Sequence, residues 1–196
     1  MKLVILGGPG AGKGTQAQPL CRHLGISEIS TSNILREAIA SGTELGHEAK
    51  IYVEKGELVP DPILIEFVRT RLVQPDAAVG WLLEGYPRTA FQAEELDFLL
   101  DDLGLQLDWA IYLQVTESVM MSRCLGRQAS VGEASAPTQK IRLDDQPQII
   151  QRRINLFYER TMPMLEYYGY RQRLLTINAD QSPQQVQQEI FQKLHT

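Results

Sequence analysis

The chain has 196 residues, of which 43% are hydrophobic and 22% charged, and its formal net charge is −5 at pH 7. This length suits one domain with its own core and perhaps small inserted lobes, and the acidic balance argues against a general nucleic-acid binder or a membrane-surface protein. The two cysteines, Cys21 and Cys124, match no metal-binding spacing. We therefore expect no zinc site and a reduced setting.

The apolar run behind Lys2 is too short for a signal peptide, and no stretch reaches the length of a membrane-spanning helix. We therefore expect a cytoplasmic protein. Of the 19 basic residues, 13 are arginines. Because the guanidinium fork suits phosphate oxygens, this bias is weak evidence for a protein that handles several phosphates.

The first predicted strand, Leu3 to Leu6, is continuously apolar, as expected for a strand buried on both faces of a parallel sheet. A glycine-rich loop follows, and then a helix to Leu24. Such a turn directs backbone N–H groups and the positive end of the helix dipole into one concavity, which suits an anion. Lys13 stands where it would reach the outer phosphates of a nucleoside triphosphate. The expected triphosphate-binding residues of this loop are Gly10, Ala11, Gly12, Lys13, Gly14 and Thr15.

Two features of this first unit are irregular. Gly14 follows Lys13, and the hydroxyl that ligates Mg²⁺ in the strict phosphate-loop pattern comes one place later, at Thr15. The sequence thus predicts that groups other than this hydroxyl help to hold the metal. Pro19 lies inside the helix and predicts a kink there. The alternative, a glycine-rich turn in an ordinary α/β protein, is disfavoured because glycine spacing, lysine, strand and helix all agree.

Farther along, strands alternate with helices, which predicts βαβ units and a parallel sheet. The predicted strands are residues 26–29, 81–83, 109–115 and 174–177. The predicted helices are residues 34–40, 44–54, 61–72, 91–103, 116–126, 147–167 and a last helix opened by Pro183. Residues 30–59 indicate a small lobe, and the aperiodic residues 128–140 indicate a mobile loop or flap.

Three predicted strand ends carry polar groups, and ligands of open α/β sheets bind at such ends. In their order along nearly the full length, these and later motifs resemble the adenylate kinases of the nucleoside-monophosphate kinase family. The matching stretches are residues 7–15, 29–36, 56–59, 83–89, 123–127 and 142–145, with Arg153 beyond them.

The resemblance implies a P-loop NTPase fold: a three-layer α/β architecture with a five-stranded parallel sheet and small monophosphate-binding and lid insertions. The core would comprise residues 1–29, 60–122 and 143–196, the monophosphate-binding lobe residues 30–59, and a short lid without zinc residues 123–142. The implied reaction is reversible, direct in-line transfer of the γ-phosphoryl group of MgATP to AMP. The implied partners are ATP, AMP and ADP, and a monomer is expected.

The resemblance also assigns roles to residues. Arg36 and Arg88 would grip the phosphate of the monophosphate, and Arg123 would stack on the ATP base. The catalytic set would be Lys13, Arg88, Arg127, Arg142 and Arg153, with Arg127 also binding ATP. The AMP-binding set would be Thr31, Arg36, Glu57, Val59, Gly85, Arg88, Gln92, Arg142 and Arg153.

Arg153 also stands out by pattern, because it is four residues from Ile149 and from Phe157 on an otherwise apolar helical face. An arginine there needs a partner, and a phosphate would serve. Its neighbour Arg152 is expected to face solvent. For each arginine the alternative is a solvated surface charge.

Three positions depart from the family pattern: Ser32 replaces a glycine, Asn33 an aspartate and Glu84 an aspartate. The family's two aspartates hold waters around Mg²⁺, so the sequence predicts weaker or altered Mg²⁺ dependence with the chemistry retained. Alternatively, Asn33 is a helix cap. Ser32 and Tyr86 leave open a kinase for another monophosphate. Asn33 and Glu84 leave open a weakly active regulatory module, which the full arginine set disfavours.

Overall fold

The computed structural model describes residues 1–129 and 146–194, with the backbone alone described for residues 127–129. Its centre is a five-stranded, all-parallel sheet with the strand order β2-β3-β1-β4-β5. The strands are β1 (Lys2–Leu6), β2 (Ser27–Ser30), β3 (Trp81–Glu84), β4 (Trp109–Gln114) and β5 (Leu174–Asn178). This confirms the predicted parallel sheet.

The apolar strand sequences explain why β1 lies in the middle. Leu3 pairs with Leu82 on one side and with Trp109 on the other, so both edges of β1 are hydrogen-bonded. Leu3 and Leu82 are fully buried. A strand that is covered on both faces and paired on both edges has no solvent-exposed side, which is why it reads as one continuous apolar run.

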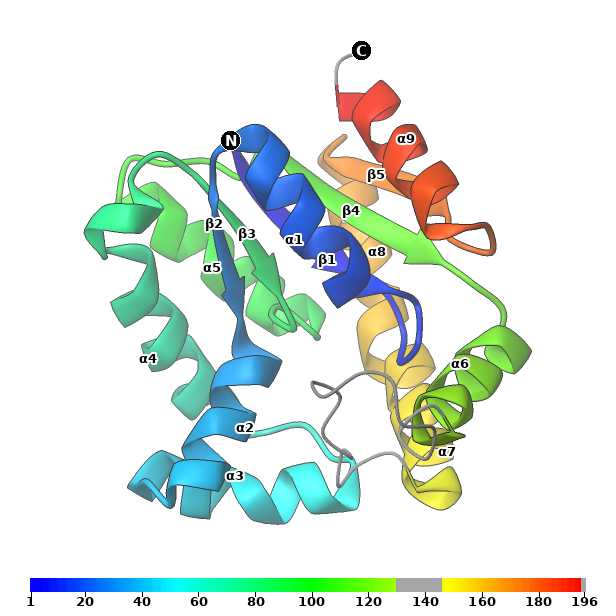
Figure 1. Cartoon of the computed structure of the whole chain (residues 1–196). Coiled ribbons are helices and arrows are strands. Elements are labelled where there is room, and N and C mark those ends of the chain that lie inside the picture. Colours follow the sequence, from blue (N-terminus) through cyan, green and yellow to red (C-terminus); the bar gives the residue numbers. More distant parts are fainter. Residues whose placement is uncertain (130–145, 195–196) are drawn as a thin grey trace.

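Helices cover both faces of the sheet, so the fold has three layers (Figure 1). Helices α1 and α9 pack together on one face, where the rings of His23 and Phe191 lie 4.3 Å apart. Helices α5 and α8 pack together on the other face. The bounds are α1 (Lys13–Leu24), α4 (Asp61–Leu72), α5 (Ala90–Asp102), α6 (Glu117–Ala129), α7 (Pro147–Leu156), α8 (Met162–Tyr170) and α9 (Pro183–Leu194).

The residues predicted as a small lobe fold into two helices, α2 (Thr31–Ser41) and α3 (Glu44–Lys55), which pack against each other. Their starts follow from their caps. The Ser30 hydroxyl accepts a hydrogen bond from the Asn33 amide, and the Thr43 hydroxyl accepts one from the Gly46 amide. The cap of α2 is therefore Ser30, and Asn33 lies inside the first turn.

The predicted helix over residues 147–167 is not one regular helix. It consists of α7, a π-helical segment η2 (Phe157–Thr161) and α8. Pro163 explains the interruption, since proline has no N–H to give and its ring collides with the carbonyl four residues earlier, that of Glu159. Glu159 lies inside the widened segment, where a π turn relieves that collision.

Other boundaries shift slightly. The second strand begins at Ser27, one residue later than predicted, because Ile26 bonds back to the end of α1 through the Cys21 carbonyl. Helix α1 continues without a break through Pro19, so this proline does not end the helix, and the predicted kink remains a prediction. A short 3₁₀ helix, η1 (Pro75–Ala77), precedes β3 and was not predicted.

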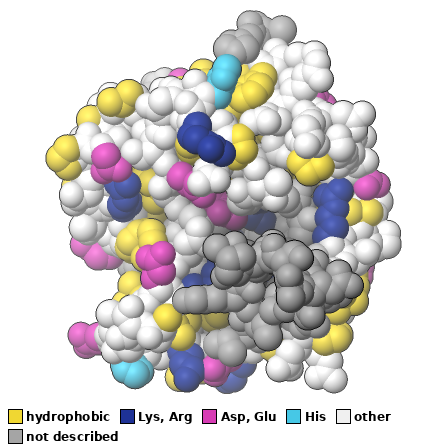
Figure 2. Space-filling view, in the orientation of Figure 1, with side chains coloured by type: hydrophobic (Ala, Val, Ile, Leu, Met, Phe, Trp, Pro, Cys, Tyr) yellow, Lys and Arg dark blue, Asp and Glu magenta, His cyan; other side chains and the backbone are white. Residues whose placement is uncertain are grey.

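Among the described residues, no helix combines the length and the apolar character that crossing a bilayer demands. On the face seen in Figure 2, hydrophobic side chains are scattered among polar and charged ones. That face therefore offers no broad apolar patch among the residues described.

Candidate functional site

The glycine-rich loop joins β1 to α1 at the carboxyl edge of the sheet. Its glycines are needed for close packing as well as for backbone shape. Gly10 has φ +75°, and a Cβ there would lie 2.7 Å from the Met120 carbonyl oxygen of α6. A larger residue would push the loop away from α6, so the loop can hold this shape because position 10 is glycine.

Lys13 is folded back over this loop. Its Nζ donates hydrogen bonds to the carbonyl oxygens of Gly7, at 2.7 Å, and Gly8, at 3.0 Å. Burial lowers the pKa of Lys13 to about 8; the Glu84 carboxylate opposes this effect, and the Arg88 and Arg153 charges add to it. Burial therefore disfavours the charged form of Lys13, and a bound polyanion would stabilise it.

A cavity opens between this loop, the α2–α3 lobe and helix α7. Four of its lining side chains are cationic: Lys13, Arg36, Arg88 and Arg153. They come from α1, α2, the loop after β3, and α7. The fold thus brings together basic residues that are up to 140 positions apart in the chain (153 minus 13). Such a cavity suits phosphate groups.

Arg88 is held through both its backbone and its side chain. Its N–H donates to the Gln92 side-chain oxygen at 2.7 Å, and its carbonyl accepts from the Thr161 hydroxyl at 2.8 Å. Its guanidinium Nε donates to the Gly85 carbonyl at 2.8 Å, and Nη2 donates to Ser32 Oγ at 2.9 Å. Four segments of the chain therefore fix the direction of this arginine.

Several predicted monophosphate-site residues line the same cavity: Thr31, Arg36, Glu57, Val59, Gly85, Arg88 and Arg153. Thr31 is buried, and its hydroxyl donates to the Glu84 carbonyl at 3.2 Å. The Glu57 carboxylate forms an ion pair with Arg152 at 2.5 Å. Arg152 is exposed, as predicted, while its charged end bridges from α7 to the chain just after α3.

Gln92 is placed differently from its neighbours in the predicted set. It is fully buried and does not line the cavity. Its amide oxygen binds the Arg88 N–H, and its amide nitrogen donates to Asp61 Oδ1 at 2.6 Å. In this structure Gln92 supports the backbone of Arg88, so contact with a base would require its amide to leave these partners.

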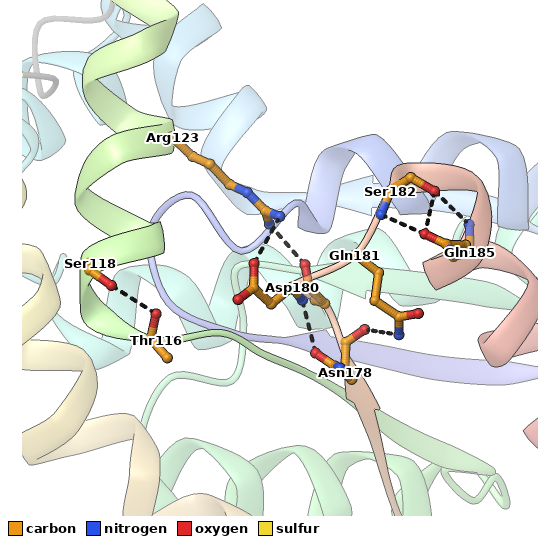
Figure 3. A network of polar contacts seen from close by, with 9 residues as sticks. Thr116, Ser118, Arg123, Asn178, Asp180, Gln181, Ser182 and Gln185 are labelled. Carbon is orange, nitrogen blue, oxygen red and sulfur yellow. Dashed lines mark hydrogen bonds and ion pairs between the residues drawn. The ribbon is translucent and has the colours of Figure 1, made fainter.

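The predicted ATP-base residue Arg123 lies on α6 and extends toward Asp180, in the chain after β5 (Figure 3). It donates to the Ala179 carbonyl at 3.0 Å and lies 3.9 Å from the Asp180 carboxylate. The Asn178 side chain accepts from the Asp180 N–H at 3.0 Å and thereby holds the turn after β5. Arg123 therefore stands over the chain between β5 and α9, outside the cavity lining.

The residues predicted to hold waters around Mg²⁺ have other contacts in this structure. The Glu84 carboxylate accepts from the Ser30 hydroxyl at 2.9 Å, and both its oxygens would lie 3.9 Å from a Cβ at Gly14. Asn33 Oδ1 accepts from Arg36 Nη2 at 2.8 Å. No group of three or more His, Cys, Asp or Glu side chains is poised to hold a metal within residues 1–129 and 146–194.

Part of the predicted site lies outside the described residues. Arg142 and most of the predicted lid belong to residues 130–145, and for Arg127 the backbone of α6 alone is described. The sequence analysis in turn missed two supporting residues. Thr161 and Asp61 hold Arg88 and Gln92, and no sequence signal marks them, because their partners are 73 and 31 residues away.

Comparison with known proteins agrees with this geometry. The family model described as adenylate kinase matches residues 5–173. "Adenylate kinase 2" of Nostoc sp. is 62% identical over 194 residues, which covers 99% of this chain and 98% of that protein. "Adenylate kinase 2" of Synechocystis sp. is 53% identical, with 99% and 100% covered. "Adenylate kinase" of Nitrobacter winogradskyi is 45% identical, with 91% and 85% covered.

Proposed function

The chain belongs to the adenylate kinase family and is an ATP:AMP phosphotransferase, and we propose that its two substrates meet in the cavity between the phosphate loop and the α2–α3 lobe. The observation that carries this proposal is the convergence of Lys13, Arg36, Arg88 and Arg153 on one cavity. Two polyanions repel each other, so their transfer reaction depends on positioning and on cations around the moving group.

The triphosphate would occupy the loop from Gly10 to Thr15. Backbone N–H groups at the start of α1 would bind its oxygens, and Lys13 would leave the Gly7 and Gly8 carbonyls to bind the outer phosphates. Arg123 would contact the ATP base. Arg127 and Arg142 would reach the transferring group from the short lid, residues 123–142, which excludes water when closed.

The monophosphate would occupy the part of the cavity beside α2. Arg36 and Arg88 would bind its phosphate, and Arg153 would lie between the two phosphate sites. Thr31, Glu57, Val59 and Gly85 would surround the base, with Gln92 joining them if its amide turns. The lobe that carries most of these residues would be residues 30–59, and residues 1–29, 60–122 and 143–196 would form the core.

Mg²⁺ is the metal that would accompany ATP, and the residues present fit such a role as outer partners. A carboxylate beside Lys13, that of Glu84, can hold waters of a cation, whereas no described residues form a protein cage for one. The ion would neutralise charge on the outer phosphates. Asn33 can take part once its oxygen leaves Arg36. No zinc would be used.

The Mg²⁺ proposal is tested by titration with Mg²⁺ at saturating nucleotides. The double variant Asn33→Asp, Glu84→Asp should reach half its maximal rate at lower Mg²⁺, because carboxylates at both places hold hydrated Mg²⁺ more tightly or at a better distance. If the double variant gains neither rate nor Mg²⁺ affinity, the proposed role of these two positions in holding Mg²⁺ is wrong.

We propose that the enzyme acts in the cytoplasm as a monomer. It would bind ATP, AMP and ADP, and neither nucleic acid nor membranes. Two observations support this. The net charge is −5, and both cysteines are buried as free thiols, which a reducing compartment maintains.

The experiment that tests the function is a coupled assay with MgATP against AMP, GMP, UMP, CMP and their deoxy forms. AMP should be the best acceptor, and Lys13→Ala should lower turnover by about 10²–10³-fold. A preference for another acceptor would favour a different monophosphate kinase. Tight ATP binding without turnover on any acceptor would favour a regulatory module.

A further inference from the structure

We infer that Ser32 and Asn33 are positioning residues that hold Arg88 and Arg36, respectively, ready for the phosphate of the monophosphate substrate. Both residues lie in the first turn of α2, and each offers a neutral oxygen to one arginine. This inference rests on the proposed role of the two arginines. It assigns the task of arranging them to two residues for which the proposed function gives no such role.

The Ser32 contact crosses from the lobe to the core. Ser32 Oγ, on α2, accepts from Arg88 Nη2 at 2.9 Å, while Arg88 Nε donates to the Gly85 carbonyl at 2.8 Å. Two hydrogen bonds from different segments fix the plane of a guanidinium group, which a single bond leaves free to rotate. A guanidinium group binds phosphate through a planar fork of N–H donors. Fixing that plane therefore sets the direction in which those donors point toward an anion.

The surroundings of Gly85 show how tightly this contact is built. Gly85 has φ +86°, and a Cβ there would lie 2.5 Å from Thr31 Oγ1 and 2.9 Å from Ser32 Oγ. The two hydroxyls therefore close directly over the Gly85 backbone. A side chain at position 85 would displace Ser32 from Arg88, so the glycine and the serine act as one unit.

The Asn33 contact lies within α2. Asn33 Oδ1 accepts from Arg36 Nη2 at 2.8 Å, and residues three apart on a helix are neighbours on its surface. Asn33 is exposed and Arg36 is partly buried toward the cavity. The asparagine thus draws the end of Arg36 toward the start of α2, where helix N–H groups also favour an anion.

Both acceptors are neutral oxygens. A hydroxyl or amide oxygen orients a guanidinium through a hydrogen bond and adds no negative charge of its own beside it. The two contacts therefore help to preorganise both arginines without themselves adding a negative charge to the site.

The first test compares Ser32→Ala with Ser32→Thr, and with Ser41→Ala as a matched control at the other, exposed end of α2. Ser32→Ala should raise the KM for AMP about three- to tenfold, the size expected for the loss of one hydrogen bond of ordinary strength. The KM for ATP should change less than twofold. Ser32→Thr should restore the KM for AMP because it keeps the hydroxyl, and Ser41→Ala should match the unmodified protein.

The second test is Asn33→Ala, assayed at saturating Mg²⁺ so that metal binding does not limit the rate. It should raise the KM for AMP about three- to tenfold, because Arg36 loses the hydrogen bond that holds its guanidinium. Asn33 is exposed, so this variant should keep its fold. It therefore preserves the test if Ser32→Ala proves unstable.

The outcomes separate this inference from the proposed function. Turnover of MgATP with AMP in the unmodified protein tests the function by itself. If that turnover is present, an unchanged or lowered KM for AMP in Ser32→Ala or in Asn33→Ala overturns the inference. Parallel rises in the KM values for AMP and ATP would also overturn it, because they would indicate a general structural defect.

Discussion

The two proposed phosphate sites of this molecule are built in different ways. The triphosphate loop is a backbone structure continuous with β1 and α1, and it adds one basic side chain, Lys13. The proposed monophosphate site consists of side chains from α2, the loop after β3, and α7. A site of backbone groups is set once the strand and helix form, whereas a site of side chains depends on the contacts that aim each one. The comparison predicts which substitutions affect which substrate.

The largest effect should come from Lys13→Met, which removes the basic side chain of the triphosphate loop. We expect kcat to fall by about 10²–10³-fold, the loss typical of one electrostatic contact to a transition state. Folding should persist, because the variant also removes a buried charge. Initial rates and thermal unfolding of the same samples check this, and a rate above about a tenth of the original would contradict it.

Arg88→Lys tests the side-chain-built site while it keeps the charge. Lysine is a point charge and cannot replace a guanidinium held by both Gly85 and Ser32. We expect kcat/KM for AMP to fall about 10–100-fold with the KM for ATP nearly unchanged. Steady-state kinetics with each substrate varied in turn measures both. An equal loss for ATP and AMP would show that the two sites are not separable.

A pH effect should distinguish the triphosphate loop from the monophosphate site. The pKa of Lys13 is about 8 in the free protein, and bound phosphates should raise it. Above pH 8 the free protein therefore carries an uncharged amine that must take up a proton when ATP binds. ATP affinity should fall by up to about tenfold per pH unit above that value.

Calorimetric titration in two buffers with different ionisation enthalpies measures this proton uptake. Lys13→Met serves as the control, because it has no amine to protonate at this position. Equal binding enthalpies in the two buffers at pH 9 for the unmodified protein would contradict the account.

The smallest effect should come from Arg152→Gln, which breaks the ion pair with Glu57 between α7 and the chain after α3. Both partners are partly exposed, with side-chain accessibilities of 54% and 33%. The loss in the free energy of unfolding should therefore be below about 1 kcal/mol, and it should shrink at high salt. Urea unfolding at two salt concentrations measures it. A larger loss would mean that this contact holds the lobe far more firmly than an exposed ion pair should.

The contrast between a backbone-built and a side-chain-built site also explains which parts of the fold and of the candidate site the sequence predicts. Apolar runs mark the strands and glycines mark the loop, so the sheet and the phosphate loop follow from local patterns. The family resemblance implied most of the arginines of the second site, and Arg36, Arg88 and Arg153 do line one cavity. Their geometry depends on long-range hydrogen bonds such as Thr161 to Arg88, which no local pattern carries.

Two particular differences show the same limit. Gln92 was predicted to contact a ligand, and that contact stays a prediction; in the structure its amide binds Arg88 and Asp61, which no local pattern indicated. The interruption of the long helix at η2 depends on where Pro163 falls relative to Glu159. A proline is visible in the sequence, but whether a helix bends, ends or widens there is decided by tertiary packing. Pro19 and Pro163 illustrate this, because α1 continues through the first without a π turn.

The most direct test of the account is a single-turnover experiment with γ-labelled ATP in rapid-quench mixing, with and without AMP. Direct transfer between two adjacent phosphate sites predicts that label passes to ADP formed from AMP, and that without AMP the label stays in ATP. Label released as inorganic phosphate, or retained on the protein in either mixture, would contradict the account.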